Sequence, residues 1–161
     1  KYFRGRLDNM MKRNPSRINY YERYQKIIEE YNAEQDKAAI EKTFIDLTNF
    51  VNDLDDEEKR YVREGFNNDE ELAMYDLLLK DSLTPAEIKK VKKLAKVLLE
   101  RIKDKISELD HWTEKEETQA AVDILIRDTL WSELPDSYDD RLLNEYRRKI
   151  YEFVYTTYPA A

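Results

Sequence analysis

Apolar residues recur at steps of three and four along almost the whole chain, and no segment longer than a few residues alternates with the period of two typical of a strand. One such seam consists of five residues spaced alternately four and three apart, namely Ile40, Phe44, Leu47, Val51 and Leu54. Only two of the 161 residues are glycine and four are proline, which disfavours turn-rich β-sandwiches. We therefore predict an all-α fold, organised as one bundle of about seven helices in a single domain over residues 1–161.

Short motifs predict where several helices begin. In the segment Thr84–Glu87, the threonine hydroxyl can accept a hydrogen bond from the Glu87 amide while the glutamate carboxylate reaches back, which is a capping box with proline at the first helical position. A long helix carrying Leu98 is expected to begin there. Two other pairs have the same spacing and predict further helix starts: Asp55 with Glu58, and Thr113 with Glu116.

Prolines and glycines predict where helices end. Asn14-Pro15 interrupts the helical pattern because a proline disfavours the α conformation in the residue before it, so the first helix should end there, with Ser16 capping the next. Leu134-Pro135 should end a later helix in the same way. Gly65 is placed to adopt the left-handed conformation beyond a helix end.

Aromatic residues are concentrated in two regions. Tyrosines, of which the chain has twelve, cluster in residues 20–31 and 138–158. Such clusters suit base stacking, partner recognition or amphipathic core packing, and we favour core and interface. Trp112 and Trp131 are likewise interpreted as packing anchors.

Residues that could carry chemistry are few. Neither Gly5 nor Gly65 begins a phosphate-binding loop, and Pro135-Asp136 lacks the acidic-x-Lys triplet of restriction-type nucleases, so it is interpreted as a helix terminus. His111 is the only histidine and cysteine is absent. Glu108-x-x-His111 matches the spacing of one di-iron ligand pair, but a second pair cannot exist, so a solvated histidine at a helix end is favoured. We expect no catalytic, cofactor-binding or metal-binding residue in this chain.

Charge is unevenly distributed. The net charge is −7, yet residues 1–17 hold six basic residues against one acidic residue, a charge of +5 that leaves −12 for the remainder. A mostly acidic body argues against broad nucleic-acid binding. The basic N-terminal segment could contact phosphate or an acidic partner surface, and its candidate contact residues are Arg4, Arg6, Lys12, Arg13 and Arg17.

Several features bear on where the protein acts. No stretch approaches the roughly 20 apolar residues needed to cross a bilayer, so no membrane role is expected. The absence of cysteine fits a reducing cytoplasm, which is the expected location. The chain starts at Lys1 without a methionine, and we expect it to be a fragment of a larger protein.

Ordered sequence blocks resemble a known family. The segment NPSRINYYERYQKIIEEYN, residues 14–32, is similar to the opening of the C-terminal helical region of restriction subunits of type I restriction-modification enzymes. Further blocks agree in the same order, namely residues 71–78 followed by Leu83-Thr84, residues 91–99, residues 120–122 with 127–131 and Leu134-Pro135, and residues 154–159. The resemblance covers nearly the whole chain.

The resemblance implies a function that no motif in this chain indicates by itself. In that family the parent subunit is a type I site-specific deoxyribonuclease, in which a nuclease domain is joined to two ATP-driven motor domains. ATP and Mg²⁺ are therefore implied for the parent, and none for this chain. The helical C-terminal region is expected to dock the subunit onto a methyltransferase core of modification and specificity subunits, and to meet DNA only through the assembled complex. The alternative is a helical module that contacts nucleic acid through the basic N-terminal segment.

Overall fold

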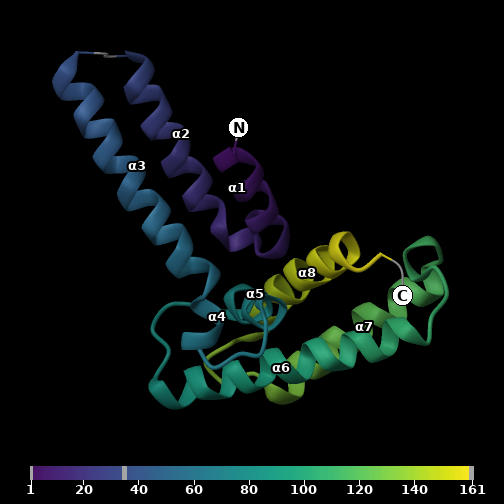
Figure 1. The fold of residues 1–161 in the computed structure, drawn as a ribbon. Coiled ribbons are helices and arrows are strands. Elements are labelled where there is room, and N and C mark those ends of the chain that lie inside the picture. Colours follow the sequence, from purple (N-terminus) through teal and green to yellow (C-terminus); the bar gives the residue numbers. More distant parts are fainter. Residues whose placement is uncertain (1, 34–35, 160–161) are drawn as a thin grey trace. The chain divides into compact units, whose positions relative to one another are not determined.

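The computed structural model describes residues 2–33 and 36–159 of the chain. These residues form eight α-helices and two single-turn 3-10 helices without a strand, which confirms the predicted all-α fold (Figure 1). The expected number of helices was about seven, one fewer than the described residues form. The elements are α1 (Tyr2–Arg13), η1 (Pro15–Arg17), α2 (Ile18–Ala33), α3 (Lys37–Glu58), α4 (Arg60–Arg63), α5 (Asp69–Leu78), α6 (Pro85–Ser107), η2 (Trp112–Glu114), α7 (Glu116–Glu133) and α8 (Asp140–Thr157). None of these helices is long and apolar enough to span a membrane.

The chain divides into two compact units, Lys1–Asp69 and Glu70–Ala161. Each has buried apolar side chains of its own. The expectation that residues 1–161 behave as one domain stays a prediction.

In the first unit, α2 and α3 form an antiparallel hairpin, and the shorter α1 lies beside α2 (Figure 1). The core of this unit draws on all three helices. Its buried members are Leu7, Met10, Ile27, Phe50 and Leu54, and Tyr20, Tyr21, Tyr24 and Leu47 pack against them. The tyrosines of residues 20–24 therefore serve packing, as favoured from the sequence.

In the second unit, α6 packs against α7 and α7 against α8 (Figure 1). The predicted capping box begins α6, because the Thr84 hydroxyl accepts from the Glu87 amide at 3.2 Å and the Glu87 carboxylate accepts from the Thr84 amide at 3.1 Å. One side of this helix is buried, and Leu98 is fully buried. The prediction of a long, one-sided helix here is confirmed.

Two other predicted capping boxes are wrong. Asp55 and Glu58 were expected to begin a new helix but lie at the end of α3. α3 itself begins at Lys37, with Asp36 as its N-cap, whose side chain accepts from the Ala39 amide at 2.8 Å. Thr113 lies within η2, and α7 starts after Lys115, which forms no side-chain cap. At the first of these places, Asp55 and Glu58 bind Arg6 of α1.

The predicted breaks are confirmed with one correction. α1 ends at Arg13, directly before Asn14-Pro15, and Gly65 adopts φ +83° after α4. Ser16 is not the cap that we expected. Ser16 lies within η1, and the Asn14 side chain caps η1, because its oxygen accepts from the Ser16 amide at 3.2 Å and from the Ser16 hydroxyl at 2.8 Å.

Candidate interaction surface

The basic N-terminal segment is partly neutralised inside the first unit. Arg6 binds Asp55 at 2.5 Å and Glu58 at 2.8 Å, the two acidic residues at the end of α3. The hydrogen bond to Glu58 is the main cause of an upward shift of the Arg6 pKa; burial opposes the shift, and the hydrogen bond and charge of Asp55 add to it. The remaining candidates, Arg4 and Lys12, are exposed.

Arg17 is a structural residue rather than a surface cation. Its side chain is 1% exposed, and it binds Glu57 at 2.8 Å and Asp69 at 2.9 Å, while Arg13 lies 3.5 Å from the same Asp69. Burial lowers the pKa of Arg17, but its hydrogen bonds to the two carboxylates outweigh burial, so the net shift is upward and the guanidinium stays charged. Glu57 also accepts from Arg60 at 2.8 Å. This network joins η1, α3, α4 and the start of α5.

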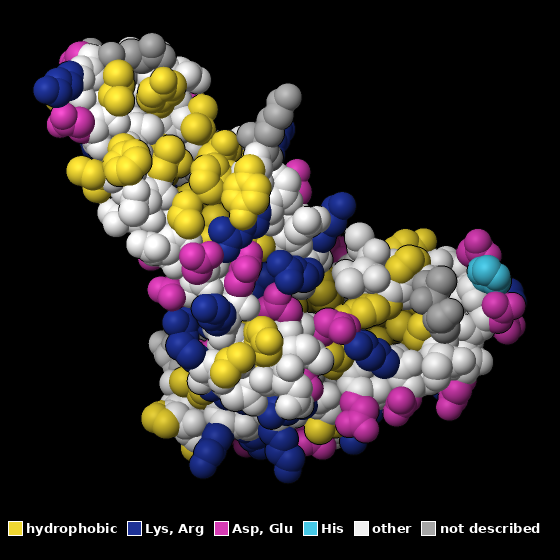
Figure 2. Space-filling model, viewed as in Figure 1, with side chains coloured by type: hydrophobic (Ala, Val, Ile, Leu, Met, Phe, Trp, Pro, Cys, Tyr) yellow, Lys and Arg dark blue, Asp and Glu magenta, His cyan; other side chains and the backbone are white. Residues whose placement is uncertain are grey.

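A contiguous apolar surface lies on the α2–α3 hairpin. We define the hairpin face as Ile28 and Tyr31 of α2 with Ile40 and Phe44 of α3. Phe44 is 72% exposed, Ile40 is 47% exposed, and Tyr31 is also exposed. Figure 2 shows hydrophobic side chains gathered over these two helices. The apolar spacing of the seam was visible in the sequence, but its exposure was not.

A second exposed aromatic lies in the other unit. Trp131 is 67% exposed, which corrects its interpretation as a packing anchor, whereas Trp112 is fully buried and its indole N–H donates to the Tyr158 carbonyl at 2.7 Å. Ile124, one heptad before Trp131 on α7, is also exposed.

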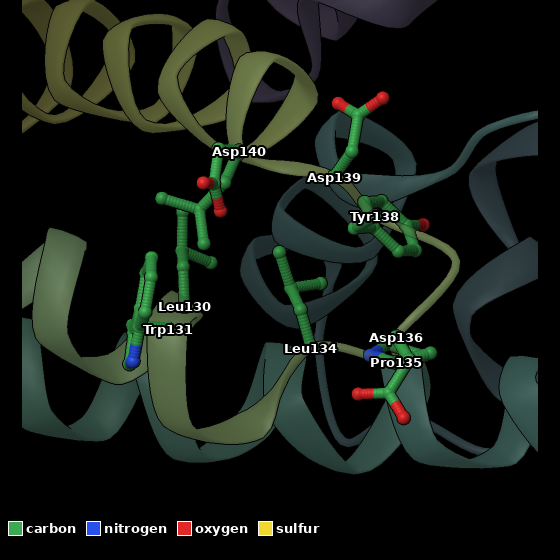
Figure 3. A pocket seen from close by; sticks show the side chains of 9 residues that line it. Leu130, Trp131, Leu134, Pro135, Asp136, Tyr138, Asp139 and Asp140 are labelled. Atoms are coloured by element: carbon green, nitrogen blue, oxygen red, sulfur yellow. The ribbon is translucent and has the colours of Figure 1, made fainter.

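A pocket of about 480 Å³ lies beside Trp131, where α7 meets the turn into α8 (Figure 3). Its carboxylates do not converge, because those of Asp136 and Asp139 point in opposite directions. Asp139 is used to cap α8, where it accepts from the Leu142 amide at 2.9 Å. The pocket therefore offers no assembled cation site. Pro135-Asp136 follows the end of α7, as expected for a helix terminus.

The described residues contain no group of three or more His, Asp or Glu side chains placed to hold a metal. His111 follows the end of α6 in a left-handed conformation, with φ +48°, so Glu108 and His111 do not share a helix face. Its imidazole is 62% exposed and lies 3.5 Å from Asp110. The solvated interpretation of His111 is confirmed.

The C-terminal tyrosines mostly pack. Tyr138 and Tyr146 are buried, and their hydroxyls donate to the carbonyls of Leu78 at 2.6 Å and Leu79 at 3.1 Å. These bonds hold the C-terminal end of α5 and the residue after it against α8 and the turn before α8. The Tyr158 hydroxyl lies 2.5 Å from Glu70.

The described residues form an all-α structure with exposed aromatic side chains on α2, α3 and α7. Residues 1–152 match the family model for the C-terminal region of proteins like the endonuclease subunit of the type I restriction enzyme HindI. The chain belongs to this family, which confirms the resemblance found in the sequence. No curated protein and no solved structure matches the chain.

Proposed function

We propose that this domain docks the restriction subunit of a type I restriction-modification enzyme onto a methyltransferase core of modification and specificity subunits. The observation that carries the proposal is the hairpin face, where Phe44 is 72% exposed beside exposed Ile40 and Tyr31. Contiguous exposed apolar side chains commonly mark protein interaction sites, and buried aromatic anchors supply much of the binding energy at such sites. The family supports the choice of partner.

Direct contact with DNA is the second candidate, and the charges favour it less. Arg6, Arg13 and Arg17 lie beside carboxylates of the same unit, so the segment carries less uncompensated positive charge than its sequence suggests. Phosphate binding depends on cations that can release counterions from DNA. In the proposed assembly, DNA is met through the complex, and nuclease and ATP-dependent motor activities belong to the rest of the parent subunit.

Deletion of this domain from the intact parent subunit tests the proposal. Size-exclusion chromatography of the truncated subunit mixed with the modification and specificity subunits should show that stable association is lost. DNA-stimulated ATP hydrolysis need not be lost, because the motor motifs lie elsewhere. Restriction should fail while modification survives. The truncated subunit must elute as a soluble species, since newly exposed apolar surface can cause aggregation.

Unchanged co-elution at matched salt would show that docking resides in another domain. Binding of the isolated chain to duplex DNA would then be measured across a salt series, with Arg4→Ala and Lys12→Ala as variants. A steep salt dependence that these variants reduce would favour the nucleic-acid role instead.

A further inference from the structure

We propose that the solvated side of α6 contacts the phosphate backbone of duplex DNA without reading its sequence. The residues concerned form the lysine face, which we define as Lys89, Lys90, Lys92, Lys93 and Lys96. This surface is distinct from the basic N-terminal segment. The choice of DNA among polyanions rests on the proposed function, in which the assembled complex holds DNA, whereas the surface itself follows from charge and exposure.

Positive charge is concentrated in the first half of α6. Residues 88–99 contain five lysines and no acidic residue, a charge of +5 in a chain of net charge −7, which leaves −12 for the remainder. Figure 2 shows Lys and Arg side chains gathered along this part of α6, at the lower edge of the view. A segment of this kind produces a local positive potential that the net charge of the chain does not reveal.

The buried side of α6 determines where these lysines point. Val91 and Leu98 are fully buried in the second unit. At about 100° per residue, the five lysines lie within about 160° of the helix circumference, on the side opposite these two residues. Two of the five are partly buried, and the exposed members are Lys89, Lys90 and Lys93.

The positive charge of the exposed members is not compensated by nearby carboxylates. Lys89, Lys90 and Lys93 form no ion pair with any residue that the structure describes. Lys103, later in the same helix, is by contrast paired with Glu70 at 2.7 Å. Three of the four arginines in the basic N-terminal segment also lie beside carboxylates. Counterion release from DNA requires cations that the protein has not already neutralised, and the lysine face supplies them.

The composition of the lysine face favours phosphate over a protein partner. Among the described residues, none of the exposed large hydrophobic side chains lies on α6. The cores of protein interfaces are depleted in lysine and enriched in aromatic residues, whereas contact with the DNA backbone requires positive charge alone. The rise from Lys89 to Lys96 is about 10 Å. Duplex DNA of that length carries about six phosphates, which is close to the number of lysines on the face.

A salt series with the whole 161-residue chain tests the inference. Its binding to a short duplex of mixed sequence is measured by fluorescence anisotropy from about 50 to 200 mM salt. The triple variant Lys89→Gln, Lys90→Gln, Lys93→Gln removes about three phosphate contacts. It should therefore reduce the magnitude of the slope of log K against log salt by about 2.7. Two duplexes of different sequence should bind with equal affinity, because backbone contacts carry no sequence information.

A second triple variant, Lys26→Gln, Lys37→Gln, Lys115→Gln, is the matched control. It replaces three exposed lysines outside the lysine face and changes the net charge equally, and it should reduce the slope by less than about 0.5. Circular dichroism should show both variants folded, since all six side chains are exposed. Absence of binding at the lowest salt, a slope that the lysine-face variant leaves unchanged, or an equal effect of both variants would each overturn the inference.

Co-elution with the methyltransferase core separates this contact from docking. The intact restriction subunit that carries the three lysine-face substitutions should co-elute with the core as the wild type does, because these lysines contact phosphate. Loss of co-elution would assign the lysine face to a protein partner and overturn the inference, while docking by this domain would stand. The salt series does not depend on docking. If deletion of the domain left docking intact while the salt series gave the expected slopes, only the proposed function would fail.

Discussion

Arg17 shows how one residue can change its role between sequence and structure. In the sequence it belongs to a basic segment with a possible contact role. In the structure it is 1% exposed and joined to Glu57, itself 5% exposed, and to Asp69. A buried charge is costly without its partner, which gives Arg17 a role in stability.

Replacing Arg17 with methionine should therefore lower the free energy of unfolding by about 3 to 5 kcal/mol, because it leaves the Glu57 carboxylate buried with less compensation. Urea denaturation followed by circular dichroism measures the change. Arg4→Met is the control at an exposed position and should change stability by less than about 0.5 kcal/mol. A loss below about 1 kcal/mol for Arg17→Met would contradict the structural role.

Tyr138 makes stability depend on alkaline pH. Burial raises its pKa above the usual value of about 10, and the nearby Tyr146 adds to the shift. The folded state therefore holds this proton more tightly than the unfolded state, so the contribution is fully present below about pH 10 and is lost as pH rises toward the folded pKa.

Tyr138→Phe should cost about 1 kcal/mol at pH 7, because the Leu78 carbonyl loses its donor. The difference in stability between this variant and the wild type should shrink as pH rises above 10. Urea titrations at pH 7 and pH 11 measure both values. A difference that does not vary with pH would argue against titration of Tyr138.

At the scale of elements, α6 has the clearest division between a buried and a solvated side. Leu98 is fully buried, and Leu98→Ala should cost about 2 to 5 kcal/mol by removing buried methyl groups and leaving a cavity. His111→Ala, in the exposed loop after this helix, should have little effect. Chemical denaturation of both variants compares them directly. A collapse caused by His111→Ala alone would contradict the solvated interpretation.

Helix boundaries were predictable where a motif acts locally. Thr84 and Glu87 satisfy each other's backbone groups, so nothing distant is needed for that helix start. Asp55 and Glu58 have the same spacing but bind Arg6, about fifty residues away in sequence. Such tertiary pairing leaves no local signal, which is why that predicted start was wrong.

At the scale of the molecule, the all-α class followed from periodicity, whereas the candidate surface did not. The seam containing Phe44 and Leu54 predicts one apolar helix face, but periodicity cannot tell which half another helix covers. In the described residues Leu54 belongs to the core that Leu7 and Met10 of α1 share, whereas Phe44 is 72% exposed. The family itself was identifiable from ordered blocks spread along the chain.

The isolated chain should give a strongly helical circular dichroism spectrum and should hydrolyse neither ATP nor DNA. The first expectation follows from its eight helices, and the second from the sequence, which has no phosphate-binding loop or restriction-type nuclease motif. Spectra and activity assays on the purified chain check both. Turnover that persists through further purification would refute the second expectation.

Because the two tryptophans lie in different environments, their intrinsic fluorescence can be used to follow the second unit. Trp112 is enclosed, and Tyr151 and Tyr155 lie edge-on to its indole, whereas Trp131 is 67% exposed. Acrylamide should quench the fluorescence of Trp131 much more than that of Trp112 in the native protein. A Trp131→Phe variant then isolates the emission of the buried indole, and a Trp112→Phe variant isolates the solvated one. The first reports loss of the native interior, and the second reports any partner that covers α7, without an attached dye.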